Sequence, residues 1–129
     1  MKAIVNMNDR KIIGYFSEKV IKLLDIDISP DTPIYLSESN ISHIRDTHTD
    51  AYIKYFDKIT EIISSPDYVG IAGVYASSIE YIKRFEEDDE WVNVAVRTSQ
   101  NGVYYLRSMF AIGEGRIQDY LKKKYLKRT

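Results

Sequence analysis

The strongest constraint on the fold lies in two strand-like segments joined by a short turn. Valine occupies every second position at the centre of Trp91–Thr98, so one side of that segment is apolar, as in a half-buried β-strand. The segment Val103–Ile112 is rich in β-branched and aromatic residues, which favour strands. Between them lies Asn101-Gly102, a dipeptide that suits the tight turn of a β-hairpin. We therefore expect the two segments to pair as antiparallel strands.

Earlier segments extend this sheet and supply a helix to cover it. Tyr68–Val74 and Ile79–Phe85 have strand-like composition, which gives an antiparallel sheet of four strands. Upstream, apolar residues recur at the three- and four-residue spacing of a helix. They predict a helix over Ala51–Ser64, capped by Thr49-Asp50, with a buried face made of Ile53, Phe56, Ile59, Ile62 and Ile63. Pro66 ends this helix, because proline biases the residue before it away from helical geometry.

The first third of the chain predicts a hairpin and a short helix. Ala3–Val5 and Lys11–Phe16 flank the turn-forming pair Asn8-Asp9, so we expect them to pair. Ser17 can cap a helix over Glu18–Leu24.

The remaining elements are short. Residues 34–36 suit a short strand, and Ser39 or Asn40 can cap a helix that runs to about His48. The apolar positions of a last amphipathic helix are Ile117, Tyr120, Leu121 and Tyr125. A length of 129 residues fits one domain. The prediction is a single α+β domain over residues 1–129, with helices packed on a four-stranded antiparallel sheet, an N-terminal hairpin and a C-terminal helix.

The composition narrows the class of protein. The sequence contains no cysteine, which excludes disulfides, thiolate-bound metals and thiol nucleophiles and fits a reducing cytoplasm. No apolar run approaches the roughly 18 residues that span a bilayer. The first residues are interrupted by Asn6, Asn8, Asp9 and Arg10, unlike a signal peptide. We expect a cytoplasmic protein with no membrane partner.

The charge is balanced overall but uneven along the chain. The net charge is −1, so no global field steers the protein to nucleic acid. Residues 114–129 nevertheless carry six bases against two acids. Two interpretations stay open: a solvated last helix that adds nothing to the core beyond Leu121 and Tyr125, or a tail that contacts phosphates.

Both histidines lie in one short stretch. His43 and His48 are five residues apart, whereas two metal ligands on a helix need a spacing of three or four. With no cysteine and no third histidine, we expect no metal and no cofactor. Acid–base chemistry needs only one imidazole that titrates near neutrality, and His48, at a predicted helix end, is the first candidate. A capping role for His48 and a packing or capping role for His43 are the alternatives.

The predicted strands contain two polar residues, Arg97 and Ser108, that could act together with the histidine. If the valines of Trp91–Thr98 face the helices, then Arg97 faces the other way. On the last strand the alternation places Ser108 with Leu106, Phe110 and Ile112, and places Tyr105, Arg107 and Met109 on the opposite side. Ser108 is either a hydroxyl available for chemistry or a small core residue bonded to the backbone. Arg97 is either a functional cation or a solvated sheet residue.

Four stretches together resemble a known family. They are residues 39–48 (Ser-Asn-Ile-Ser-His-Ile-Arg-Asp-Thr-His), residues 63–70 (Ile-Ser-Ser-Pro-Asp-Tyr-Val-Gly), residues 92–96 and residues 104–110. The pattern is similar to phage- and mobile-element-associated members of the barnase–EndoU–colicin–RelE superfamily, over about residues 34–113.

The resemblance implies an activity: metal-independent RNA cleavage, in which a 2′-hydroxyl attacks the adjacent phosphate. Carried over by position, it makes His48, or less directly His43, the general acid or base. Arg97 would stabilise the charge on the phosphorane, and Ser108 would bond a phosphate oxygen. The near-neutral charge of the chain departs from this pattern, and the N-terminal hairpin and basic tail lie outside it.

A second class of function also fits the sequence. The eleven tyrosines suit base stacking and protein interfaces equally. The alternative is therefore a catalytically inactive binding module of a mobile element, which inhibits a host protein through a tyrosine-rich sheet face. The expected partner is RNA in the first case and a host protein in the second.

Overall fold

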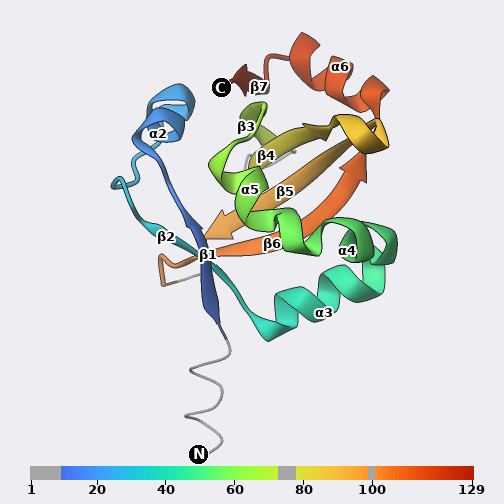
Figure 1. The fold of residues 1–129 in the computed structure, drawn as a ribbon. Coiled ribbons are helices and arrows are strands. Elements are labelled where there is room, and N and C mark those ends of the chain that lie inside the picture. Colours follow the sequence, from blue (N-terminus) through green and yellow to red (C-terminus); the bar gives the residue numbers. More distant parts are fainter. Residues whose placement is uncertain (1–9, 73–77, 99–100) are drawn as a thin grey trace, which may run out of the picture.

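The computed structural model describes residues 10–72, 78–98 and 101–129. A single mixed sheet holds the described strands together, in the order β1-β2-β6-β5-β4-β3-β7 (Figure 1). The strands are β1 (Lys11–Tyr15), β2 (Pro33–Leu36), β3 (Tyr68–Ala72), β4 (Ser78–Phe85), β5 (Glu90–Thr98), β6 (Tyr104–Ile112) and β7 (Leu126–Arg128). The α-helices are α2 (Glu18–Leu24), α3 (Glu38–Thr47), α4 (Thr49–Tyr55), α5 (Ile59–Ser64) and α6 (Glu114–Lys122), and short 3-10 turns span Phe56–Lys58 and Glu86–Asp88.

The α+β class is confirmed, but the predicted sheet of four antiparallel strands is wrong. β3, β4, β5 and β6 form the expected antiparallel centre. β2 adds to this centre in parallel with β6 through Ile34 and Tyr35, and β1 pairs with β2. β7 adds at the far edge against β3. Among the described residues the sheet therefore has seven strands and one parallel junction.

The predicted N-terminal hairpin is only partly testable, because Ala3–Val5 lies outside the described residues. Its second strand, β1, pairs with β2. Between these strands the chain forms α2, and the predicted cap is confirmed: the backbone N–H of Val20 donates to Ser17 Oγ at 3.2 Å.

The central hairpin forms as predicted, with an irregularity that changes one face. β5 and β6 pair antiparallel from Trp91 and Ile112 to Thr98 and Tyr104. Ala95 is opposite Ser108, yet the next residue, Val96, is opposite Leu106. β6 thus has one additional residue at Arg107, a β-bulge, which reverses the alternation of side chains beyond it.

The core occupies the side of the sheet that carries Val92, Val94 and Val96, here called the inner face. These valines are fully buried and pack with apolar residues of α3, α4 and α5. The predicted continuous helix over 51–64 is wrong, because a 3-10 turn separates α4 from α5. Ile53, predicted to be buried, is 73% exposed. The break turns the helical face, so that Ala51 and Tyr55 are the buried residues of α4, while Ile59, Ile62 and Ile63 of α5 are buried as predicted.

The opposite side of the sheet, here called the outer face, is covered at one end by α6. Ile117 of α6 packs with Ile82 and Ile112 of the sheet and with Leu126 of β7. The predicted last helix ends earlier than expected, at Lys122, and Leu126 is buried. The interpretation of the tail as solvated beyond Tyr125 is therefore wrong for Leu126.

β7 can lie close to β3 because Gly70 has no side chain where the Tyr125 carbonyl passes.

None of the helices in the described part of the chain is long and apolar enough to cross a membrane.

Candidate functional site

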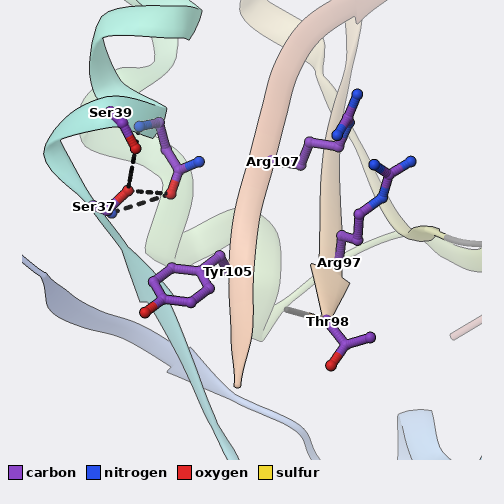
Figure 2. Close-up of a pocket in the computed structure, with 7 residues that line it drawn as sticks. Ser37, Ser39, Arg97, Thr98, Tyr105 and Arg107 are labelled. Atoms are coloured by element: carbon purple, nitrogen blue, oxygen red, sulfur yellow. Dashed lines mark hydrogen bonds between the residues drawn. The ribbon is translucent and has the colours of Figure 1, made fainter. Parts of the chain in front are cut away.

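An open cavity of about 410 Å³ lies between the beginning of α3 and the outer face of β5 and β6. Its lining residues are Ser37, Ser39, Asn40, Arg97, Thr98, Tyr105 and Arg107. The size is within the usual range for a small-molecule site. Figure 2 shows the polar side chains at the beginning of α3 on one side of β6 and both arginines on the other.

The wall formed by α3 is built around its N-cap. Ser37, not the predicted Ser39 or Asn40, is the cap residue. Ser37 Oγ accepts from the Asn40 N–H at 3.3 Å and donates to Asn40 Oδ1 at 2.6 Å, while the Ser37 N–H donates to the same Oδ1 at 3.3 Å. Ser39 Oγ is 3.1 Å from Ser37 Oγ. This network fixes hydroxyl and amide groups at the positive end of the helix dipole.

The opposite wall carries two cations, which the register of the hairpin brings to one cavity. Arg97 is opposite Tyr105 on the outer face. Arg107 is the bulge residue, is exposed and lines the same cavity. A bulge commonly re-aims a side chain beside a functional site. The cavity therefore combines two guanidinium groups with hydroxyls and a helix N-terminus, a combination suited to phosphate.

Among the predicted site residues, Arg97 lines this cavity, whereas His43, His48 and Ser108 do not. His48 lies at the junction of α3 and α4, where it ends one helix and begins the next. Its ring packs 5.5 Å from Phe110 and 6.3 Å from His43, measured between ring centroids.

The two histidines lie farther along α3 than the residues that line the cavity. His43 follows Asn40 by three residues and Ser39 by four, which puts the three side chains along one side of α3. α3 packs on β6 beyond the end of β2 (Figure 1). The distance along α3 from the N-cap to His48 is roughly 16 Å, at 1.5 Å per residue. The cavity with its arginines thus lies at one end of α3, and the imidazoles lie at the other.

Ser108 lies on the outer face between these ends. It is 8% exposed and opposite Ala95. It shares the outer face with Phe110 and Ile112, as predicted. The prediction that Leu106 is on the same side is wrong: Leu106 and Met109 are both buried in the core of the inner face, because the bulge lies between Leu106 and Ser108.

Sequence reasoning missed a buried carboxyl group behind Arg97. Glu80 of β4 is 8% exposed and opposite Ala95, with Asn93 and Arg97 two residues to either side. Burial raises the pKa of Glu80 to about 7, although the nearby Asn93 amide and the charge of Arg97 both favour the carboxylate. Within the described part of the chain, Glu80 Oε2 and the Asn93 amide atoms have no hydrogen-bond partner. A polar residue in the central strand β4 was the signal that could have found it.

No group of three or more histidine, aspartate or glutamate side chains in the described ranges is arranged to hold a metal ion. The imidazoles of His43 and His48 do approach each other, contrary to what a five-residue spacing on one helix implies. They do so because α3 ends between them, at Thr47.

Fold and site together define a mixed α+β protein with an arginine-lined cavity at one side of its sheet. Residues 11–119 match the family model described as phage-Barnase-EndoU-ColicinE5/D-RelE like nuclease3. The chain belongs to this nuclease-like family, which confirms the resemblance seen in the sequence and extends it to β1 and α6. Comparison with curated proteins and with solved structures gives no match.

Proposed function

We propose that this chain is a metal-independent endoribonuclease that holds single-stranded RNA in the cavity and along α3 beside β6, toward the two histidines. The observation that carries the proposal is the cavity that Arg97 and Arg107 line together with the hydroxyl-bearing N-terminus of α3. These groups suit a phosphodiester. The membership of a nuclease-like family supports the same class of substrate.

In the proposed reaction the 2′-hydroxyl of one nucleotide attacks the adjacent phosphorus atom. A base removes the hydroxyl proton as the new O–P bond forms, and an acid protonates the departing 5′-oxygen, leaving a 2′,3′-cyclic phosphate. Arg97 stabilises the negative charge that develops on the phosphate oxygens. The His43–His48 pair supplies the acid or base, with His48 as the first candidate. Ser108, on the outer face of β6, donates to a phosphate oxygen in this proposal.

The buried Glu80 carboxyl group has a positioning role in this proposal. It lies on the side of Arg97 away from the N-terminus of α3, on the neighbouring strand β4. Its negative form attracts the guanidinium and so restricts where Arg97 can direct its charge.

The test is cleavage of mixed-sequence RNA in the presence of a chelator. His48→Ala should lower the rate by roughly 10²–10⁴-fold, the usual effect of losing a general acid or base. Arg97→Ala should lower it by roughly 10²–10³-fold through lost charge stabilisation. The matched control is Arg128→Ala, which removes an exposed arginine at the far edge of the sheet. Folding of each variant is checked by circular dichroism.

Two results would change the assignment. A larger loss from His43→Ala than from His48→Ala would transfer the acid–base role to His43, which lies one helical turn from the cavity wall. Absence of cleavage by the parent protein, or cleavage that chelator abolishes, would contradict the proposal.

The binding module remains the second candidate, favoured by one observation: Ser108 is buried and the His48 ring packs against Phe110, so neither lines the cavity. In that case a host protein would contact the tyrosine-bearing outer face. An inactive parent protein that captures one host protein, and loses it when Tyr105 is changed to Ala, would support this candidate.

A further inference from the structure

A pair of tyrosines adjoins the cavity on the outer face. Tyr35 of β2 and Tyr105 of β6 are opposite each other across the parallel junction of the sheet. Their ring centroids are 6.0 Å apart and the rings are tilted by 43°. Both side chains are partly exposed, whereas Ile34 and Leu106 beside them are fully buried on the inner face. The parallel junction therefore presents two aromatic rings to solvent.

A third residue covers this pair. The guanidinium carbon of Arg10 lies 4.3 Å from the centroid of the Tyr35 ring, in a cation–π arrangement. Arg10 Nη1 also donates to the Tyr105 hydroxyl at 3.2 Å. Arg10 is exposed, so few contacts oppose its movement. A flat, charged group thus occupies the place above Tyr35 that a stacked ring would take.

Tyr105 connects this cluster to the proposed phosphate site. It lines the cavity together with Arg97 and Arg107, and Arg97 is its neighbour across the hairpin. The outer face therefore offers stacking surfaces and phosphate-binding groups side by side. A ligand that satisfies both must carry a flat ring joined to a phosphate.

We propose that Tyr35 and Tyr105 form a stacking subsite for a nucleobase of single-stranded RNA, next to the phosphate held by Arg97 and Arg107. The inference rests on the proposed function and assigns it a substrate class: RNA with an unpaired base beside the reacting phosphate. The base displaces the Arg10 guanidinium from Tyr35, and Arg10 then pairs with the adjoining backbone phosphate. Stacking on aromatic rings is available to every base, so this subsite selects single-stranded over paired RNA without reading a sequence.

The test uses a short 2′-O-methyl RNA oligomer that contains one 2-aminopurine, a fluorescent base whose emission falls when it stacks. The 2′-O-methyl group blocks cleavage, so binding is measured by itself. Tyr35→Leu keeps apolar bulk and removes the aromatic ring, and it should raise Kd by roughly 10-fold or more and abolish the quenching. Tyr35→Phe should leave both nearly unchanged. Tyr15→Leu, at an exposed tyrosine of β1, is the matched control.

The outcomes separate this inference from the proposed function. Equal Kd and quenching for the parent and Tyr35→Leu would overturn the subsite, even if Arg97→Ala still weakens binding. An oligomer of the same length without bases should bind the parent and Tyr35→Leu equally, and any difference between them would also overturn it. Quenching that depends on Tyr35, in a protein that cleaves no RNA, would support the subsite and refute the nuclease. Failure of the parent to bind the oligomer would refute both.

Discussion

The buried carboxyl group of Glu80 should make the protein less stable as the pH rises toward neutrality. Its pKa is raised from 4.5 to about 7 in the folded state. Between these values the folded protein keeps a proton that the unfolded chain releases, so the free energy of unfolding falls with increasing pH. Below about pH 4.5 both states are protonated, and above about pH 7 both are ionised, so the fall is confined to this interval.

The magnitude follows from the difference between the two pKa values. At about 1.4 kcal/mol for each pH unit, it amounts to at most about 3.4 kcal/mol of stability lost between pH 4.5 and pH 7 or above. Glu80→Gln keeps the shape of the side chain and cannot ionise. The variant should therefore be more stable than the parent at pH 8 by up to about 3 kcal/mol, and the difference should disappear near pH 4.5.

The assay is urea denaturation at several pH values between 4.5 and 8, followed by the fluorescence of Trp91, the one tryptophan of the sequence. The linear dependence of the free energy on urea gives the stability at each pH. Glu87→Gln, at an exposed glutamate, is the control and should not change the pH dependence. A parent protein whose stability is flat over this range, or a Glu80→Gln variant less stable than the parent at pH 8, would refute the reasoning.

Three further predictions concern the edges of the fold and the cavity wall. Leu126→Ala should lower stability by about 2–5 kcal/mol, because it empties a buried position of β7, whereas Lys127→Ala should be nearly neutral in the same urea titration. Ser37→Ala should cost about 1 kcal/mol through loss of the N-cap, and a cost no larger than that of Ser39→Ala would contradict this role. If Lys122–Lys124 contact phosphates, replacing all three with glutamine should reduce the slope of log Kd for RNA against log salt by about 2 to 3; an unchanged slope would assign them to solvent.

The sequence predicted those elements whose formation depends on local patterns. Alternating valines and an Asn-Gly turn identified β5 and β6, and Ser17 correctly marked the beginning of α2. Pairing between distant segments was not predictable in this way. β2 joins β6 through only two registered pairs, Ile34 with Tyr104 and Tyr35 with Tyr105, and no periodicity within either segment encodes that contact.

The site was predicted only in part, because some of its residues follow from local patterns and others depend on tertiary structure. Arg97 could be found because its face follows from the alternation of a regular strand. The other residues of the cavity could not be found in this way. Arg107 reaches the cavity because of a β-bulge, and a single additional residue in a strand cannot be recognised from the amino-acid composition. Ser37 was missed because three serines and asparagines close together all make plausible caps. Glu80 was missed because only tertiary packing determines that β4 is covered on both faces.

The two walls of the cavity come from distant parts of the chain, and this affects the stage of folding at which the site forms. One wall comes from the beginning of α3, but the other comes from the β5–β6 hairpin, which follows much later in the chain and joins the first wall through β2. The pairing of β2 with β6 is non-local and forms slowly, because a long loop must close before the stabilising contacts can form. A nascent or partly folded chain therefore has the arginines and serines of the site but lacks the cavity that brings them together. In the proposed function, RNA cleavage would therefore depend on closure of the β2–β6 junction during folding.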